Sequence, residues 1–293
     1  MKYFDYFEPT TLSEASSLLT YYGKDAKILA GGTDLLVRMK RQVLTPRYLI
    51  NLKRISGLDT ITVSDGALRI GALATIRAVH TSSVVREHWG VVAEAAQKMA
   101  SMQVRNLATI GGNLCNAAPS ADMAPALIGL GASVRIVGPS GERTVGLEEF
   151  FVGPGATVLG EGEILTELIV SRPRPKTGAV HIKYAIRKAM DIALVGVAVV
   201  TTLDASSKRL DDVRVVLGAV APTPLRARRT EEVLRGRAVP LEDVALGEAA
   251  EIAMEEAKPI SDVRASEYYR RKLVGVLVRR ATSQALERAS EGR

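Results

Sequence analysis

The last third of the chain changes pattern after a segment that is rich in proline and charge. Residues 171–178 read SRPRPKTG, a composition typical of a domain boundary. Strand-like stretches follow at residues 179–187, 192–203 and 212–220. Beyond them only helical patterns remain, at about 227–235, 241–257 and 262–288. Because strands precede helices in this order, the sequence predicts a separate C-terminal α+β domain, residues 179–293, built on a three-stranded antiparallel sheet with helices.

Residues 1–57 form a first region in which strands and helices alternate. Thr11 and Glu14 have the spacing of a capping box, and Gly23 stands where a glycine commonly ends a helix. A helix is therefore expected between them. Short strands are expected at residues 27–30 and 47–51. These elements predict a first small subdomain.

Residues 58–175 form a second region with more alternation. The Asp65-Gly66 pair between two alternating stretches is typical of a hairpin turn. The expected elements are paired strands at 60–63 and 67–72, a helix at 89–100, paired strands at 132–138 and 143–147, and a strand at 164–170. Residues 108–113 are expected to be a strand end or a loop broken by two glycines. This pattern predicts a second subdomain.

Cysteine and histidine usage excludes several classes of site. The single cysteine, Cys115, excludes a disulfide scaffold and any zinc or iron–sulfur site built from this chain's own thiolates. The three histidines are scattered along the sequence and do not suggest a metal cluster. No apolar run approaches the roughly 20 residues of a membrane helix, and the N-terminus resembles no signal peptide. We therefore expect a soluble, cytoplasmic protein without an integral membrane segment and without a metal site of its own.

The net charge of +7 raises the question of nucleic-acid binding. Aromatic residues make up only 4% of the chain, which leaves few stacking platforms for single strands. The basic residues gather at 225–237 and 268–280, and the second stretch has the spacing of an amphipathic helix with a basic face. A solvated helix face or a protein-docking surface explains these stretches, and no nucleic-acid partner is expected.

Two glycine pairs are the strongest candidates for a ligand site, since common dinucleotide, phosphate-loop and hydrolase motifs are absent. The first pair, Gly31-Gly32, follows a predicted strand and precedes a helix that begins at Thr33 or Asp34. The second pair lies in residues 109–113, and Asp122 follows it. Glycines allow a ligand to approach the backbone, and successive N–H groups at such turns form an anion-binding concavity. Two such concavities suit a pyrophosphate with a long polyhydroxyl tail.

Three longer motifs then identify a family. The segments AGGTDLL (30–36), ATIGGNLCNAAPSADMAPAL (108–127) and KYAIRKAMDIALV (183–195) together resemble the FAD-binding medium subunit of molybdenum hydroxylases, the xanthine dehydrogenase and carbon monoxide dehydrogenase family. The resemblance covers essentially the whole chain, and the motifs occur in the family's order. It implies an FAD-binding fold of the vanillyl-alcohol-oxidase (PCMH) type in two subdomains, residues 1–57 and 58–175, followed by the C-terminal domain.

The resemblance also implies which residues bind FAD. The pyrophosphate would be wrapped by residues 28–35, namely Ile28, Leu29, Ala30, Gly31, Gly32, Thr33, Asp34 and Leu35. The second segment would contribute Thr109, Gly111, Gly112 and Asn113. Met99 and Leu165 match positions that pack on the cofactor, Asp122 would accept hydrogen bonds from ribityl or ribose hydroxyls, and Lys183 would lie near the polar edge of the flavin. Arg187 and Asp191 match a charged pair near the flavin ring, and an ordinary structural ion pair explains them equally well.

The implied function is electron transfer rather than substrate chemistry. The resemblance implies a heterotrimer in which a large subunit carries the molybdenum cofactor and hydroxylates the substrate, and a small subunit carries two 2Fe–2S clusters. FAD, bound noncovalently to this chain, would pass the electrons to an external acceptor, and the heterotrimer would dimerise. The lone cysteine agrees with this division, because the clusters must lie on another chain. The alternative is a self-sufficient FAD-dependent oxidoreductase of the same fold.

Overall fold

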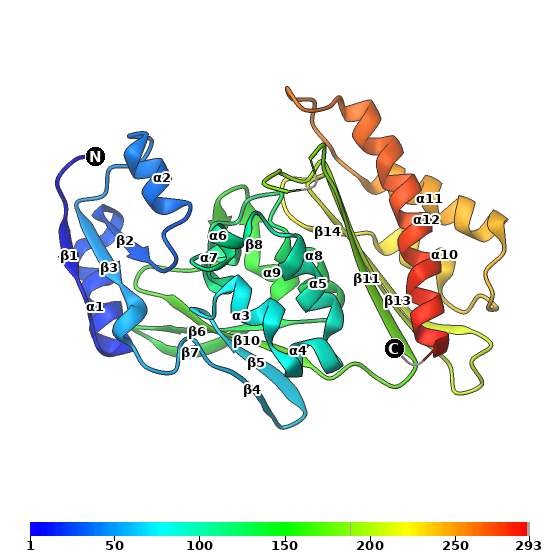
Figure 1. The fold of residues 1–293 in the computed structure, drawn as a ribbon, viewed down its shortest axis with the longest axis horizontal. Helices are drawn as coiled ribbons and strands as arrows, with labels where there is room; N and C mark the ends of the chain where they lie inside the picture. The colour runs from blue at the N-terminus through cyan, green and yellow to red at the C-terminus, as the bar shows by residue number, and fades with distance from the viewer. Residues whose placement is uncertain (188, 292–293) are drawn as a thin grey trace.

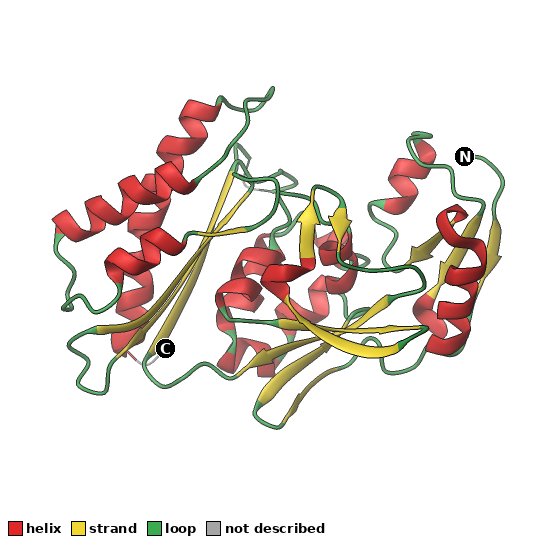
Figure 2. Ribbon diagram, turned by 180° about the vertical axis from the view of Figure 1, so that it is seen from behind, coloured by secondary structure: helices red, strands yellow, loops and turns green. Residues whose placement is uncertain are grey.

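The computed structural model describes residues 1–187 and 189–291, which form three lobes along one long axis (Figure 1). Each lobe has its own sheet: three strands in the first, five in the second and four in the third. A further two-stranded sheet, β8 (Phe151–Gly153) with β9 (Ala156–Thr157), belongs to the middle lobe. Figure 2 shows the same lobes from behind, with most helices of the last lobe gathered on the outer side of its sheet.

The first lobe is a parallel sheet in the order β1-β3-β2. Its strands are β1 (Asp5–Phe7), β2 (Ala26–Leu29) and β3 (Tyr48–Asn51), and its helices are α1 (Leu12–Tyr22) and α2 (Leu35–Lys40), with 3₁₀ turns η1 (Gly23–Asp25) and η2 (Leu52–Arg54). Helix α1 begins after Thr11, whose hydroxyl accepts a hydrogen bond from the Glu14 N–H, and ends at Gly23 with a φ of 51°. The predicted helix and both predicted strands are confirmed.

The middle lobe is an antiparallel sheet in the order β4-β5-β10-β6-β7. The strands are β4 (Ile61–Ser64), β5 (Ala67–Gly71), β6 (Ser133–Gly138), β7 (Gly141–Gly146) and β10 (Ile164–Ser171). The helices are α3 (Ile76–Thr81), α4 (Ser83–His88), α5 (Gly90–Lys98), α6 (Met102–Arg105), α7 (Ile110–Cys115), α8 (Met123–Gly129) and α9 (Leu147–Phe150). Both predicted hairpins pair as expected, and β10 lies between them.

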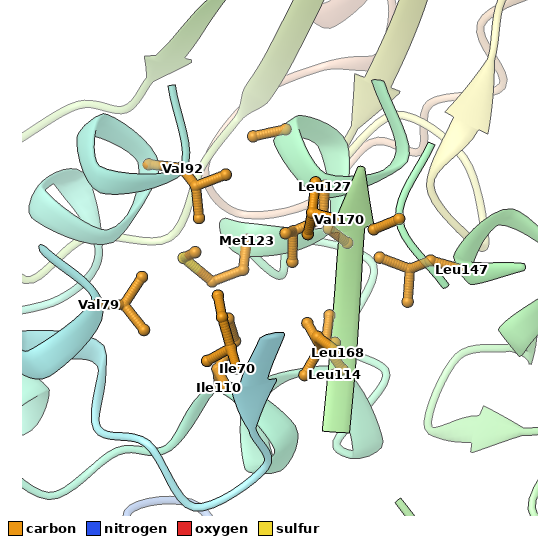
Figure 3. Close-up of a cluster of buried hydrophobic side chains, with 14 of the residues drawn as sticks. Ile70, Val79, Val92, Ile110, Leu114, Met123, Leu127, Leu147, Leu168 and Val170 are labelled. Carbon is orange, nitrogen blue, oxygen red and sulfur yellow. The ribbon is translucent and has the colours of Figure 1, made fainter. Parts of the chain in front are cut away.

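The core of the middle lobe lies between this sheet and its helices (Figure 3). Alternating residues of the strands, such as Leu68 and Ile70, are fully buried, and so are Ile110 and Leu114 on α7. In Figure 3 the labelled side chains, which come from strands and helices, surround Met123, the first residue of α8. Burying these apolar side chains provides the main stabilisation of the lobe.

The third lobe is a sheet in the order β11-β12-β13-β14. Its elements are β11 (Thr177–Tyr184), β12 (Val195–Leu203), β13 (Leu210–Gly218), β14 (Leu225–Arg226), α10 (Arg228–Leu234), α11 (Asp243–Glu256) and α12 (Glu267–Glu291). Strand β12 is buried on both faces along its whole length. Its Ala198 joins the core of the middle lobe, whereas Val197 and Val199 join the core under α12. The sheet is therefore covered by α12 on one side and by the middle lobe on the other.

Four sequence expectations need correction. Residues 108–113 are no strand end or loop, because α7 starts at Ile110 with Thr109 as its N-cap. The C-terminal sheet has a short fourth strand, β14, which was not predicted because Pro222 and Pro224 directly precede it. Strand β11 ends at Tyr184 rather than at residue 187, and α12 begins at Glu267 rather than at residue 262. Residues 292–293 of the predicted C-terminal domain lie outside the described residues.

Candidate cofactor site

A cleft of about 770 Å³ lies between the first lobe and the middle lobe. Such a volume is within the range of about 300–1,000 Å³ that is common for small-molecule and cofactor sites. The cleft wall includes most of the residues singled out from the sequence: Ile28, Ala30, Gly31, Gly32, Thr33, Asp34, Leu35, Met99, Thr109, Gly111, Gly112, Asn113 and Leu165. The structure thus brings the two glycine segments, almost eighty residues apart in the chain, to one cavity.

The two glycine segments lie directly against each other. A Cβ added at Gly31 would come within 2.2 Å of the Leu107 carbonyl oxygen, and one at Gly111 within 2.7 Å of Ala72. These two glycines therefore allow close packing of backbone on backbone. Gly32 has a φ of +76°, which favours glycine in the turn from β2 to α2. The main effect of these glycines is to let the segments around the cleft pack closely and turn tightly.

The backbone of the first segment offers hydrogen-bond donors to the cleft. In the described part of the chain, the N–H groups of Gly32, Thr33 and Asp34 donate no backbone hydrogen bond, and the carbonyl of Gly32 accepts from Leu36. The three successive N–H groups lie at the cleft wall between β2 and α2. They form the kind of donor cluster that binds anions.

The second segment offers no such cluster, which corrects the expectation of a second backbone concavity. The N–H of Gly111 donates to the Ala72 carbonyl at 2.9 Å, and that of Asn113 donates within α7. The N–H of Gly112 donates to the Thr109 hydroxyl oxygen at 3.1 Å, since Thr109 caps the helix. The second segment therefore contributes side chains and surface to the cleft, and the N–H groups of its two glycines and of Asn113 are already bonded.

Asn113 carries an unsatisfied polar atom at the cleft wall. Its amide oxygen Oδ1 is buried and has no hydrogen-bond partner in the described part of the chain, and its Nδ2 contacts the Met99 sulfur at 3.9 Å. A buried polar atom without a partner costs about 1–3 kcal/mol. Such an atom is commonly satisfied by a ligand or an ordered water.

Asp122 and Lys183 lie outside the wall of this cleft and bind each other. The Lys183 ammonium donates to Asp122 Oδ2 at 2.8 Å and to the Lys98 carbonyl at 3.2 Å. The Asp122 side chain is 11% exposed, and the Lys183 side chain is 8% exposed. Burial raises the pKa of Asp122, and the ammonium of Lys183 opposes this shift. Leu29, at the end of β2, is likewise absent from the cleft wall.

A smaller pocket of about 230 Å³ lies beside this ion pair. Its wall is made by Lys98, Lys183 and most of the connection from β11 to β12. Arg187 and Asp191 belong to this wall, with an ion-pair distance of 3.5 Å between Arg187 Nη2 and Asp191 Oδ1. The pKa of Asp191 is lowered mainly by the hydrogen bond that its carboxylate accepts from the backbone N–H of Arg187.

Lys98 and His181 are site neighbours that the sequence did not reveal. The Lys98 ammonium donates to the His181 carbonyl at 2.5 Å, which joins the end of α5 to the edge strand β11. His181 is 1% exposed, and burial lowers the pKa of its imidazole to about 3, so the ring is neutral. Neither residue belongs to a motif, and their proximity depends on how the third lobe packs on α5.

The single thiol is buried, and the described residues contain no metal-binding cluster. Cys115 lies in the cleft wall, and burial raises the pKa of its thiol to about 12. Among residues 1–187 and 189–291, no cluster of three or more His, Cys, Asp or Glu side chains is arranged to hold a metal ion. Within the same residues, no helix is both long enough and apolar enough to span a membrane.

Two family profiles match the chain over most of its length. The first, described as the FAD binding domain in molybdopterin dehydrogenase, matches residues 2–173. The second, described as the CO dehydrogenase flavoprotein C-terminal domain, matches residues 180–285.

Individual relatives agree with these profiles. The chain is 34% identical to a xanthine dehydrogenase FAD-binding subunit of Escherichia coli O157:H7, over 97% of this chain and 96% of that one. It is 35% identical to a carbon monoxide dehydrogenase medium chain of Afipia carboxidovorans, over 98% of both chains. A solved carbon monoxide dehydrogenase of Hydrogenophaga pseudoflava superimposes with a TM-score of 0.94 at 34% identity, covering 98% of both chains. The chain therefore belongs to the family of FAD-binding subunits of molybdenum hydroxylases.

Proposed function

We propose that this chain binds FAD noncovalently and carries electrons within a heterotrimeric molybdenum hydroxylase. The observation that supports this most strongly is the cleft itself, which both glycine segments line. Its residues fit FAD. The free N–H groups of residues 32–34 suit a pyrophosphate, and the unpaired Asn113 oxygen suits a hydroxyl or N–H donor of the cofactor.

Each wall of the cleft has a proposed task. The turn at residues 28–35 holds the pyrophosphate through its backbone. Thr109, Asn113, Met99 and Leu165 hold the cofactor from the middle lobe, where Met99 and Leu165 are buried apolar side chains. Asp122 and Lys183 flank the smaller pocket and act as one ion pair beside the flavin ring. When bound, FAD supplies a ring that takes up electrons singly or in pairs.

The assembly and its division into domains are part of the proposal. A large subunit with the molybdenum cofactor would hydroxylate the substrate, and a small subunit with 2Fe–2S clusters would deliver electrons to this chain. We further propose a dimer of such heterotrimers and the domain division 1–57, 58–175 and 179–293, which follows the three separate sheets. The cytoplasmic location stays a prediction.

Comparing the isolated chain with the chain in its complex tests the electron-transfer role. The isolated chain is expected to bind FAD, to release it intact on acid precipitation, and to oxidise no substrate. With both partner subunits present, an aldehyde, purine, N-heteroaromatic or carbon monoxide substrate should bleach the flavin absorbance under anaerobic conditions. Substrate oxidation by the isolated chain would contradict the proposal.

A further inference from the structure

Helix α2 presents one side to the large cleft. Leu35 and Arg38, three residues apart and therefore on one face of the helix, both belong to the cleft wall. Met39 is 2% exposed and anchors the helix, whereas Lys40 is exposed and is absent from the cleft wall. Arg38 is therefore the charged side chain that α2 contributes to the cleft.

The backbone of Arg38 is fixed, and its guanidinium is free. The Arg38 N–H donates to the Asp34 carbonyl at 3.0 Å, and the Arg38 carbonyl accepts from the Val43 N–H at 3.0 Å, where the chain folds back after the helix. The side chain is exposed, and within residues 1–187 and 189–291 it makes no hydrogen bond and no ion pair. The residue thus offers an unpaired cation from a defined position.

The Arg38 side chain is expected to reach the free N–H groups at the start of the same helix. Side chains of an α-helix lean toward its N-terminus, over the preceding turn. The four residues from Asp34 to Arg38 span only about 6 Å along the helix axis. A long arginine side chain therefore extends back along α2, toward the turn at residues 32–34 whose N–H groups are free in the described part of the chain.

Two further cations of the described cleft wall lie at the other end of β2. Lys24 belongs to η1, and Lys27 is the second residue of β2. The strand carries the chain away from them, at about 3.3 Å per residue, before the turn at residues 32–34 begins. Among the described residues of the cleft wall, Arg38 is therefore the cation that lies next to the free N–H groups along the chain.

The acids of the described cleft wall oppose an anionic ligand to different degrees. Glu163 is bound by Arg143 through two hydrogen bonds of 2.7 Å. Glu161 lies beside Gly23, where an added Cβ would come within 3.4 Å of Glu161 Oε1. Asp34, by contrast, is exposed next to the free N–H groups, and its side chain makes no capping hydrogen bond. An anion bound at these N–H groups therefore needs a cation that offsets the Asp34 carboxylate.

We propose that Arg38 binds the pyrophosphate of FAD through its guanidinium, beside the free N–H groups of residues 32–34. The proposal rests on the function proposed above. A guanidinium presents paired N–H donors that match the oxygens of a phosphate group. The backbone N–H groups supply only partial charges, whereas Arg38 supplies a full positive charge and offsets the carboxylate of Asp34.

Titration of the flavin-free full chain with FAD tests this proposal. Arg38→Gln should bind FAD roughly tenfold more weakly, because a charge-assisted hydrogen bond is lost. Arg38→Lys keeps the charge but not the paired donors, so its affinity should be intermediate. The matched control is Lys40→Gln, which removes the same charge from the same helix outside the cleft wall and should bind FAD like the wild type.

The salt dependence of FAD binding is a second readout, which a merely structural role of Arg38 would not change. Raising the salt concentration from about 0.05 M to about 0.5 M screens an exposed ionic contact, so it should weaken FAD binding by the wild type more than by Arg38→Gln. Thermal unfolding of the flavin-free chain should be the same in both, since the side chain is exposed and unpaired in the described part of the chain.

The outcomes separate the two proposals. If the wild-type chain binds no FAD, the proposed function fails. If it binds FAD but Arg38→Gln binds it equally well, only the role of Arg38 is overturned. An equal loss of affinity in Lys40→Gln would also overturn it, because the effect would then be one of overall charge. A loss in Arg38→Gln with an unchanged salt dependence would overturn the ionic contact.

Discussion

Individual buried polar residues mark the junction between the middle lobe and the third lobe. His181, Asp122 and Lys183 are each almost completely removed from solvent there, and each is held by a group from another element. Burial of ionisable groups shifts the pKa of Asp122 upward and that of His181 downward. At the scale of the residue, this junction is therefore sensitive to pH.

His181 gives a prediction for stability against pH. Its pKa is about 3 in the folded chain, below its ordinary value of 6.5, so the unfolded chain binds the proton more readily. Stability should therefore be full above about pH 6.5 and fall as the pH drops toward 3. Between pH 7 and pH 5 the wild type should lose about 2 kcal/mol more unfolding free energy than His181→Leu.

Urea unfolding at both pH values measures this difference. His80→Gln, at a half-buried histidine of α3, serves as the control and should behave like the wild type. Equal pH dependence in the wild type and His181→Leu would show that the imidazole is not buried in its neutral form.

Asn113 gives a prediction for cofactor affinity. Asn113→Ala removes the buried oxygen that has no partner among the described residues, so the folded chain should lose no stability. FAD affinity should fall by about 1 kcal/mol, roughly fivefold, if the cofactor donates to that oxygen. Titration of FAD against the wild type, Asn113→Ala and the control Asn106→Ala checks this. Unchanged affinity in Asn113→Ala would remove the residue from the site.

At the scale of the element, the cap of α1 and the two hairpins could be predicted from the sequence. The contacts that these elements make with other elements could not. Thr11, Glu14 and Gly23 act within one helix, so local spacing predicted α1 correctly. Helix α7 (Ile110–Cys115) forms because the Thr109 hydroxyl caps its start and Leu114 is buried against the sheet. Two adjacent glycines weaken the local helix preference, and the sequence therefore indicated a strand end or a loop instead.

The two glycine segments also make contacts that could not be predicted from the sequence. Their shared location in one cleft was expected from the family resemblance, but the reason for Gly31 depends on Leu107, more than seventy residues away. The Gly111 N–H is unavailable to a ligand because it donates to the carbonyl of Ala72 in the middle lobe. Nonlocal backbone contacts of this kind leave no periodic signal in a sequence.

Gly31→Ala tests that contact. Its Cβ would overlap the Leu107 carbonyl, so the β2–α2 turn and the segment before α7 must separate. The variant should lose about 1–3 kcal/mol of unfolding free energy and bind FAD more weakly. Gly247→Ala in α11, where the added Cβ meets no atom within 4 Å, should be neutral or stabilising. Equal stability of the two variants, measured by urea unfolding, would disprove the close contact.

At the scale of the whole molecule, the third lobe is a structural part of the site. One face of its sheet completes the core of the middle lobe, and the connection from β11 to β12 forms the wall of the smaller pocket. The order of strands and helices predicted this lobe, and the sequence had no means to show which face would meet α8. Which face packs there depends on the fit between two apolar surfaces whose residues lie far apart in the sequence.

Gly218 lies at this interface. A Cβ there would come within 2.8 Å of Pro125 on α8, so Gly218→Val should push the C-terminal sheet away from the middle lobe. The expected cost is about 1–3 kcal/mol of unfolding free energy, together with a calorimetric transition that is broader or split. A single transition at the wild-type temperature would mean that the lobes are not coupled at this point.

The cleft between the first two lobes is the proposed binding site of FAD. The most direct measurement is a titration of the purified chain, freed of any bound flavin, with FAD, followed by its absorbance and by the FAD released on acid precipitation. One FAD should bind per chain and should be released completely by acid. A chain that remains folded and binds no FAD would contradict it.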